Sequence, residues 1–228
     1  MNRSKLTYAV PVLGLFAMAA RWVLYTAGTD ARGLLVSHHP AGYGALVLAL
    51  LAFAAVWFAQ APERKLKNTA VQSLALALGL LVSSNGGTGS FPMLNGLLTL
   101  SRYAAAVILA VQALYAFQKK QAPFGLNAGL CVCFILRLIG SYQVWSRVPQ
   151  IQNYLFALLA CLCLAAFAYQ QAAGEVGLGS PRWCFRFALW GCFFCMAASI
   201  GATVQLVYLL FALWLYAQAL CPVSEEVQ

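Results

Sequence analysis

The chain has 228 residues, of which 63% are hydrophobic and 8% charged, and its formal net charge at pH 7 is +9. A mean hydropathy of +0.79 is more apolar than a water-soluble fold can accommodate, which excludes that class and favours a lipid bilayer as the solvent. In a soluble protein the positive charge would indicate a nucleic-acid partner. Here the basic residues lie mainly between apolar stretches, so we expect contact with anionic membrane lipids and no nucleic acid.

Eight apolar stretches follow one another along the chain, each about as long as the ~20 helical residues that cross a bilayer. They are solid apolar blocks, without the alternation of a membrane barrel, and backbone amides in lipid must be satisfied within their own segment. The sequence therefore predicts an all-α, polytopic membrane helix bundle that forms a single domain, 1–228. The predicted spans lie near residues 7–27, 43–61, 68–84, 100–118, 125–144, 152–171, 183–200 and 203–220.

Basic residues distinguish the two sides of the predicted bundle. The N-terminus and the second, fourth and sixth gaps carry most of them, whereas the odd-numbered gaps hold only Arg32 and Arg147. By the positive-inside rule, the even gaps and both termini face the cytoplasm of a cell (inner) membrane, which requires an even number of spans. Ala17-Met18-Ala19 also suggests a cleavable signal peptide, which would leave seven spans. The apolar run continues through Trp22–Tyr25, as an uncleaved anchor would.

The even-numbered spans end alike, in Trp57-Phe58-Ala59-Gln60, Tyr115-Ala116-Phe117-Gln118, Phe167-Ala168-Tyr169-Gln170 and Leu215-Tyr216-Ala217-Gln218. Four repeated helical hairpins would explain this pattern. Two parallel repeats, 7–118 and 125–220, would also explain it and would place Arg21 opposite Arg137. Aromatic residues collect at any membrane interface, however, and a glutamine just beyond them is ordinary. Duplication and interface composition both remain open.

Three arginines are the most unusual side chains. Counted from the cytoplasmic end, Arg21 and Arg137 lie past the middle of spans 1 and 5, and Arg102 opens span 4 at the outer surface. An arginine near mid-bilayer costs at least about 2.5 kcal/mol, so it normally faces the bundle interior or water. None of the five acidic residues lies inside a predicted span. The chain therefore offers these arginines no carboxylate at the same depth in the membrane.

Two ways of accommodating the arginines remain. They can bond to backbone carbonyls, water, Tyr25, Tyr142 or Gln112, or they can bind an anion such as a lipid phosphate or a substrate carboxylate, which suits a guanidinium. Snorkelling to the outer interface is the simpler interpretation of Arg102. The candidate ligand-binding residues are Arg21, Arg137, Arg102, Tyr25 and Tyr142.

Catalytic and metal-binding patterns are weak. No Asp, Glu or His lies within a predicted span, which argues against a proton relay and an intramembrane protease. His38, His39 and Asp30 share the first external gap, but adjacent histidines on a loop are usually only exposed side chains. The eight cysteines, nearly all within spans, are expected to pack as small apolar groups. We expect no metal, no cofactor and no enzymatic activity.

Two stretches carry a resemblance to a known group. One extends from Asp30 through Gly33-Leu34-Leu35 to His39-Pro40, and the other from Tyr142 through Trp145-Ser146 and Pro149-Gln150 to Tyr154. Both resemble uncharacterised multi-spanning membrane proteins of anaerobic Firmicutes. The likeness extends loosely along most of the chain, including residues 174–182. The resemblance implies a bacterial membrane protein and carries no activity and no functional residue.

Two functions remain open. The first is binding or transport of a small anionic or lipid-like ligand in the outer half of the bundle, which the intramembrane arginines favour. The second is a non-catalytic accessory or sensory subunit that docks to a partner membrane protein, which the lack of a soluble domain favours. A membrane-embedded enzyme would have to rely on the exposed histidines and Asp30.

Overall fold

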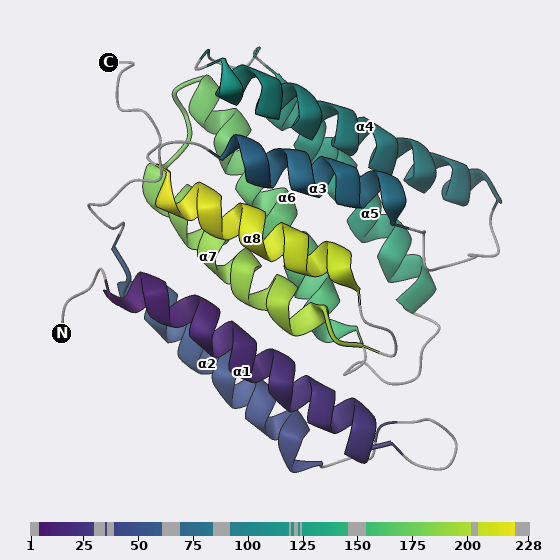
Figure 1. Cartoon of the computed structure of the whole chain (residues 1–228), viewed down its shortest axis with the longest axis vertical. Coiled ribbons are helices and arrows are strands. Elements are labelled where there is room, and N and C mark those ends of the chain that lie inside the picture. Colours follow the sequence, from purple (N-terminus) through teal and green to yellow (C-terminus); the bar gives the residue numbers. More distant parts are fainter. Residues whose placement is uncertain are drawn as a thin grey trace.

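In the computed structural model the described residues are 5–29, 35, 39–60, 69–83, 92–118, 120, 123, 125–145, 154–201 and 205–221. Within these ranges the chain forms eight α-helices, so the predicted all-α bundle is confirmed (Figure 1). The helices are α1 (Lys5–Ala27), α2 (Pro40–Phe58), α3 (Ala70–Val82), α4 (Pro92–Phe117), α5 (Leu126–Trp145), α6 (Leu155–Glu175), α7 (Pro181–Ala198) and α8 (Leu206–Leu220).

Five helices are long and apolar enough to cross a membrane: α1, α2, α5, α6 and the part of α4 from Gly96 onward. The apolar helices α3 and α8 are shorter, with 13 and 15 residues. Helix α7 carries two arginines in its first half, which lower its hydropathy. Large apolar side chains such as Phe16, Leu50 and Leu213 are exposed on the surface, as expected for a membrane protein whose outer face contacts lipid.

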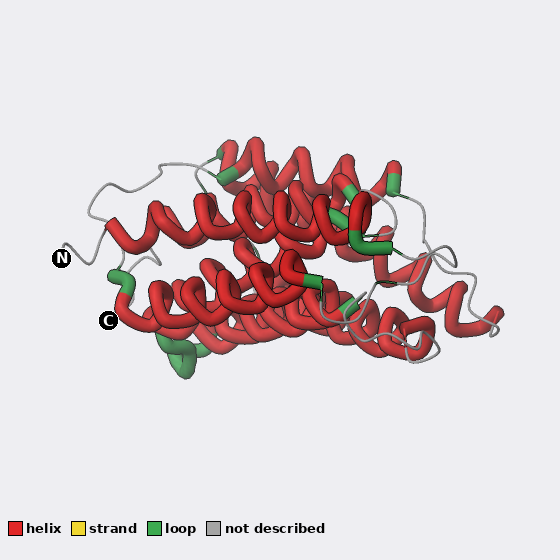
Figure 2. Tube along the Cα trace, turned by 90° about the horizontal axis from the view of Figure 1, so that it is seen from below, coloured by secondary structure: helices red, strands yellow, loops and turns green. Residues whose placement is uncertain are grey.

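Helix α7 is the most connected element and packs against α1, α2, α6 and α8. Further packing of α8 on α3, α3 on α4, α4 on α5 and α5 on α6 closes a ring of six helices. The α1–α2 hairpin lies outside this ring against α7, at the lower edge of Figure 1, and Figure 2 shows the helices running side by side. The ring interior is filled by side chains. One example is Trp214, whose ring lies 5.4 Å from that of Phe167 and whose Nε1 donates to Ser73 Oγ at 3.1 Å.

The first residues of α1 and the last residues of α8 lie at the same end of the bundle, on the left in Figures 1 and 2. We call this the terminal end and the other the distal end. Consecutive helices are antiparallel, so odd-numbered helices begin and even-numbered helices end at the terminal end. A hydrogen bond from Thr7 Oγ1 to the Gln60 carbonyl oxygen (2.9 Å) ties the start of α1 to the residues just after α2 there.

Helix bounds agree with the predicted spans except in two places. Helix α4 begins at Pro92, eight residues before the predicted position 100, because a proline at the first helical position has a suitable φ and needs no amide partner. Helix α6 continues to Glu175, beyond the predicted 171, and ends in a turn where Gly177 has a φ of +75°. Seven residues, 199–205, connect α7, which ends at Ala198, to α8, which begins at Leu206.

Candidate functional site around the buried arginines

Arg21 is buried near the distal end of α1, with 2% of its surface exposed. Its Nε donates to the carbonyl oxygen of Ile200 at 2.9 Å, and its Nη2 donates to the Tyr25 hydroxyl at 3.2 Å. The guanidinium carbon lies 5.0 Å from the ring centroid of Phe156, a distance typical of a cation–π contact. Tyr25 is one of the partners that the sequence offered for the arginines, and residues four apart share one face of a helix.

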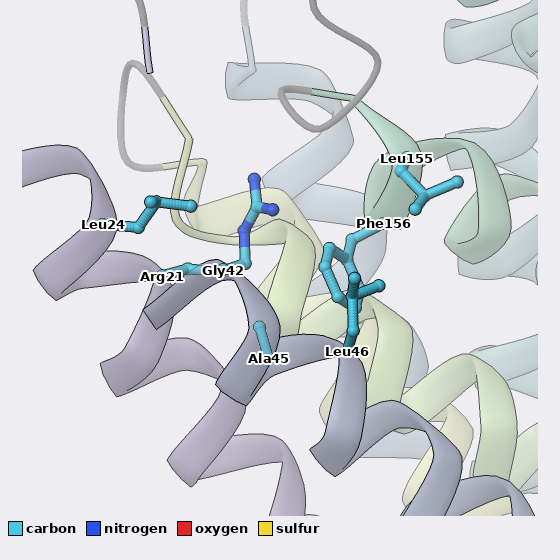
Figure 3. Close-up of a pocket in the computed structure, with 7 residues that line it drawn as sticks. All are labelled: Arg21, Leu24, Gly42, Ala45, Leu46, Leu155 and Phe156. Carbon is cyan, nitrogen blue, oxygen red and sulfur yellow. The ribbon is translucent and has the colours of Figure 1, made fainter. Parts of the chain in front are cut away.

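A pocket of ≈ 190 Å³ lies beside Arg21, between the α1–α2 hairpin and the start of α6. Figure 3 shows the guanidinium between Leu24 on one side and Phe156 with Leu46 on the other. Gly42 helps to leave this space, because a Cβ built on it would have only the Leu24 side chain within 4 Å. The walls are therefore apolar, and a single cation lies at their edge. The complete lining is Arg21, Leu24, Gly42, Ala45, Leu46, Leu155 and Phe156.

Arg137 occupies a different environment, among α5, α6 and α8. Its guanidinium carbon lies 5.8 Å from the Tyr208 ring centroid and 5.7 Å from that of Phe211. The guanidinium also interacts with the Tyr208 hydroxyl and the Cys161 thiol, which are themselves 3.9 Å apart. Its Nε is buried and has no hydrogen-bond partner within the described part of the chain. These contacts join three helices, so Arg137 acts in bundle packing.

The contacts of Arg21 and Arg137 lead to different parts of α6. Arg21 meets Phe156, one residue after the helix begins, whereas Arg137 meets Cys161. Five residues of α-helix correspond to about 7.5 Å of rise and about 140° of rotation, so these two contacts are on different faces of α6. The structure therefore places the two arginines in separate environments, and only Arg21 lines the distal-end pocket.

Arg102 and Tyr142 lie outside both environments. The sequence placed Arg102 at the opening of span 4, but the residue lies ten positions after Pro92 because α4 begins earlier than predicted. Its Nη1 donates to the carbonyl oxygen of Ser83, the residue that caps the end of α3. A cation at a helix C-terminus is stabilised by the helix dipole, which explains Arg102 as an intramolecular cap. Tyr142 is 54% exposed, and the aromatic hydroxyl that interacts with Arg137 is that of Tyr208.

The polar residue Gln112 also lies away from the arginines. Its Nε2 donates to Asn127 Oδ1 at 2.9 Å, and Asn127 Nδ2 in turn donates to Glu175 Oε1 at 2.8 Å. A third hydrogen bond, from the Gly125 amide to Glu175 Oε2 at 3.0 Å, completes the network. This network links α4, α5 and α6 at the terminal end and gives the last residue of α6 several partners.

One buried arginine was not among the sequence-based candidates. Arg186, in the second turn of α7, is 4% exposed and donates from Nη2 to the Trp57 carbonyl oxygen at 3.0 Å. Its guanidinium carbon lies 4.3 Å from the Trp57 ring centroid and 5.1 Å from that of Trp183. An arginine with two tryptophans at the end of a span is a pattern typical of a membrane interface. This combination of an arginine with tryptophans at a span end is the sequence signal by which Arg186 could have been found.

The sequence predicted no catalytic or metal-binding role for the histidines and the cysteines. His39 caps α2, accepting a hydrogen bond at Nδ1 from the Ala41 amide at 3.3 Å, whereas His38 and Asp30 lie outside the described residues. No disulfide joins the eight cysteines, all of which are described, and seven of them are buried. Among the described residues no group of three or more His, Cys, Asp or Glu side chains could hold a metal ion.

No protein-family model, curated protein or solved structure matches this chain.

Proposed function

We propose that this protein is a multi-pass protein of a bacterial inner membrane that binds an anionic lipid or lipid-like molecule in the outer half of its bundle. The pocket beside Arg21 carries this proposal, because it combines apolar walls with a guanidinium at their edge. Such a combination suits an amphiphile whose aliphatic part packs against the walls while its anionic group lies near the cation.

Charge supports an orientation with both termini in the cytoplasm. Lys5, Lys120, Arg182 and Arg186 all belong to the terminal end of the bundle, where α1 and α7 begin and α4 ends. Cytoplasmic segments of membrane proteins are enriched in lysine and arginine. This orientation places the distal end, with the pocket at Arg21, in the outer half of the membrane.

The size of the pocket favours a chain-like ligand over a compact solute. Pockets that enclose a drug-sized molecule usually have about 300–1,000 Å³, whereas this one has ≈ 190 Å³. Leu46, which lines it, is 39% exposed on the outer surface of α2. An acyl chain could therefore enter from the bilayer and leave part of its length among the surrounding lipids.

The anionic group is assigned to Arg21 because of the contacts that position this side chain. The Ile200 carbonyl and the Tyr25 hydroxyl accept hydrogen bonds from its Nε and Nη2, and these two contacts hold the guanidinium at the edge of the pocket. In an apolar setting a guanidinium attracts an anion more strongly than in water. The proposed site consists of Arg21 and Tyr25 with the pocket walls, while Arg137, Arg102 and Tyr142 lie outside it.

The test is thermal unfolding of the purified protein in a neutral detergent, with added phosphatidylglycerol or the zwitterionic phosphatidylcholine. Gly42→Leu fills part of the pocket. Gly44→Leu, two residues away on the same helix, is the matched control, because a Cβ built on Gly44 has nothing within 4 Å. At a lipid concentration about 100 times the Kd, binding stabilises by ~2.7 kcal/mol, which raises Tm by about 5–10 °C.

We expect phosphatidylglycerol to stabilise the wild type and the Gly44→Leu variant more than phosphatidylcholine does. Gly42→Leu and Arg21→Gln should lose the part of this selective shift that the pocket at Arg21 contributes, so each should be stabilised less than Gly44→Leu. Equal shifts in Gly42→Leu and Gly44→Leu would refute the pocket as the binding site. Absence of any lipid or small-anion shift, together with copurification of a stoichiometric membrane protein in mild detergent, would instead support the docking-subunit function.

A further inference from the structure

A second and larger pocket, of ≈ 730 Å³, lies at the terminal end between the end of α2 and the start of α7. It differs from the pocket at Arg21 in that polar and apolar groups share its surface, and a charged side chain, Arg182, forms part of its wall. The lining residues are Trp57, Phe58, Ala59, Gln60, Pro181, Arg182 and Phe185.

Arg182 and Arg186 are one helical turn apart on α7, so they share a face and their like charges repel. Arg182 is exposed, and no residue in the described part of the chain forms a hydrogen bond or ion pair with it. Behind it, Arg186 is held between the rings of Trp57 and Trp183, and its buried Nε has no hydrogen-bond partner among the described residues. Arg182 therefore presents a guanidinium with unused donors to the pocket, and the positive charge of Arg186 behind it adds to the attraction for an anion.

The start of α7 adds further donors to the same wall. Ser180, which precedes the helix, makes no capping hydrogen bond with its side chain, and the first turn of α7 contains no acidic residue. The amides of Arg182 and Trp183 belong to the first turn, where backbone N–H groups lack intrahelical acceptors. A helix N-terminus also carries a partial positive charge that attracts phosphate.

Two tryptophans indicate the level at which this pocket lies in the membrane. Trp57 and Trp183 have ring centroids 6.1 Å apart in an edge-to-face arrangement, and Trp57 itself lines the pocket. Tryptophan side chains gather at the level of lipid headgroups, where one edge is apolar and the other is hydrated. The pocket is therefore at the height of a phospholipid phosphate, with apolar side chains such as Phe185 available to the upper acyl chain.

We propose that this terminal-end pocket binds the phosphate group of an anionic phospholipid, held by Arg182 and the first turn of α7 with Arg186 behind it. The recognised chemistry is a phosphate oxyanion, which a lipid phosphodiester or free inorganic phosphate could supply. The tryptophan pair and the apolar wall favour the lipid. This site is at the opposite end of the bundle from Arg21, so it does not depend on the function proposed above.

The experiment measures stabilisation of the full chain in neutral detergent by phosphatidylglycerol, phosphatidylcholine or inorganic phosphate. Arg182→Gln removes the exposed cation of the pocket. Lys120→Gln is the control, because it removes one exposed positive charge at the same end, just after α4, without touching the pocket. The double variant Gly42→Leu/Arg182→Gln separates the two proposed sites, since Gly42→Leu alone leaves the terminal-end pocket intact.

In the Gly42→Leu background we expect phosphatidylglycerol to bind with an apparent Kd that Arg182→Gln raises about fivefold to tenfold, as for the loss of one charge-assisted pair at a partly exposed site. Lys120→Gln should change it less than twofold. Stabilisation by the lipid but not by millimolar phosphate identifies the headgroup as the ligand, and stabilisation by both identifies the phosphate group itself. Equal effects of Arg182→Gln and Lys120→Gln, or equal stabilisation by the two lipids, would overturn the proposal.

Discussion

Three glycines, one at the end of α6 and two in the turn before α7, provide a sharp test of the fold that presents Arg182. Helix α6 ends where the amides of Leu178 and Gly179 both donate to the Ala173 carbonyl oxygen at 2.9 Å. Gly177 has a φ of +75°, which residues with a Cβ adopt only with strain. Gly179 lies against the backbone, so a Cβ built there would come within 2.7 Å of atoms of Gly174 and of the Gln170 carbonyl oxygen.

These surroundings predict a graded response to three single changes to alanine. Gly179→Ala brings a methyl group against backbone atoms that cannot rotate away, so we expect a loss of about 3 kcal/mol, the upper part of the range for overpacking. Gly177→Ala forces a left-handed conformation on alanine and should cost about 1–2 kcal/mol. Gly174→Ala, at the end of α6 with nothing within 4 Å of the added Cβ, should be neutral or stabilising by up to ~1 kcal/mol.

Thermal unfolding followed by a thiol-reactive fluorescent dye suits this comparison, because seven of the eight cysteines are buried and become reactive on unfolding. For a chain of this length, 1 kcal/mol corresponds to about 2–4 °C in Tm. Gly179→Ala should therefore melt roughly 6–12 °C below the wild type, and Gly174→Ala at or slightly above it. If Gly179→Ala and Gly174→Ala melted together, the described packing of this turn would be wrong.

The remaining predictions concern single side chains in the bundle. Ser73→Ala should lower stability by about 1 kcal/mol in detergent unfolding, because the buried indole N–H of Trp214 loses its acceptor, and an unchanged midpoint would contradict this bond. Tyr208→Phe removes the hydroxyl that interacts with Arg137 and should cost about 1 kcal/mol by the same assay, whereas no loss would show that the aromatic rings alone hold the guanidinium. In the folded protein a maleimide should label one thiol, Cys221, just beyond α8. Partial burial raises the pKa of Cys221, so its labelling rate should keep increasing above pH 9, and labelling of several thiols or a plateau below pH 9 would refute this.

The helices were predictable because their signal lies in local composition. Solid apolar blocks bounded by charged gaps located all eight helices, and only α4 differed by more than a few residues. Its first turns contain Asn95 and Gly96, which weaken the apolar signal, while Pro92 starts the helix for a reason of backbone geometry. Local composition thus predicts which segments are helical better than it predicts where a helix begins.

The contacts of the arginines were predictable only where the partner residue is close in the sequence. Tyr25 follows Arg21 by four residues, so their contact follows from helix periodicity. The other partners of Arg21, Ile200 and Phe156, come from segments more than 130 residues away and depend on how α1 packs against the bundle. The same limit explains why Arg137 meets Tyr208 of α8 and not its sequence neighbour Tyr142.

A high-resolution density map of the protein in lipid nanodiscs containing phosphatidylglycerol would show whether a lipid occupies the pocket beside Arg21. We expect elongated density between Leu46 and Phe156, with its polar end within hydrogen-bonding distance of the Arg21 guanidinium. The same map of Gly42→Leu should lack that density while the surrounding helices keep their positions. A well-resolved wild-type pocket without lipid density, or density that persists unchanged in Gly42→Leu, would contradict the assignment of this pocket as a lipid-binding site.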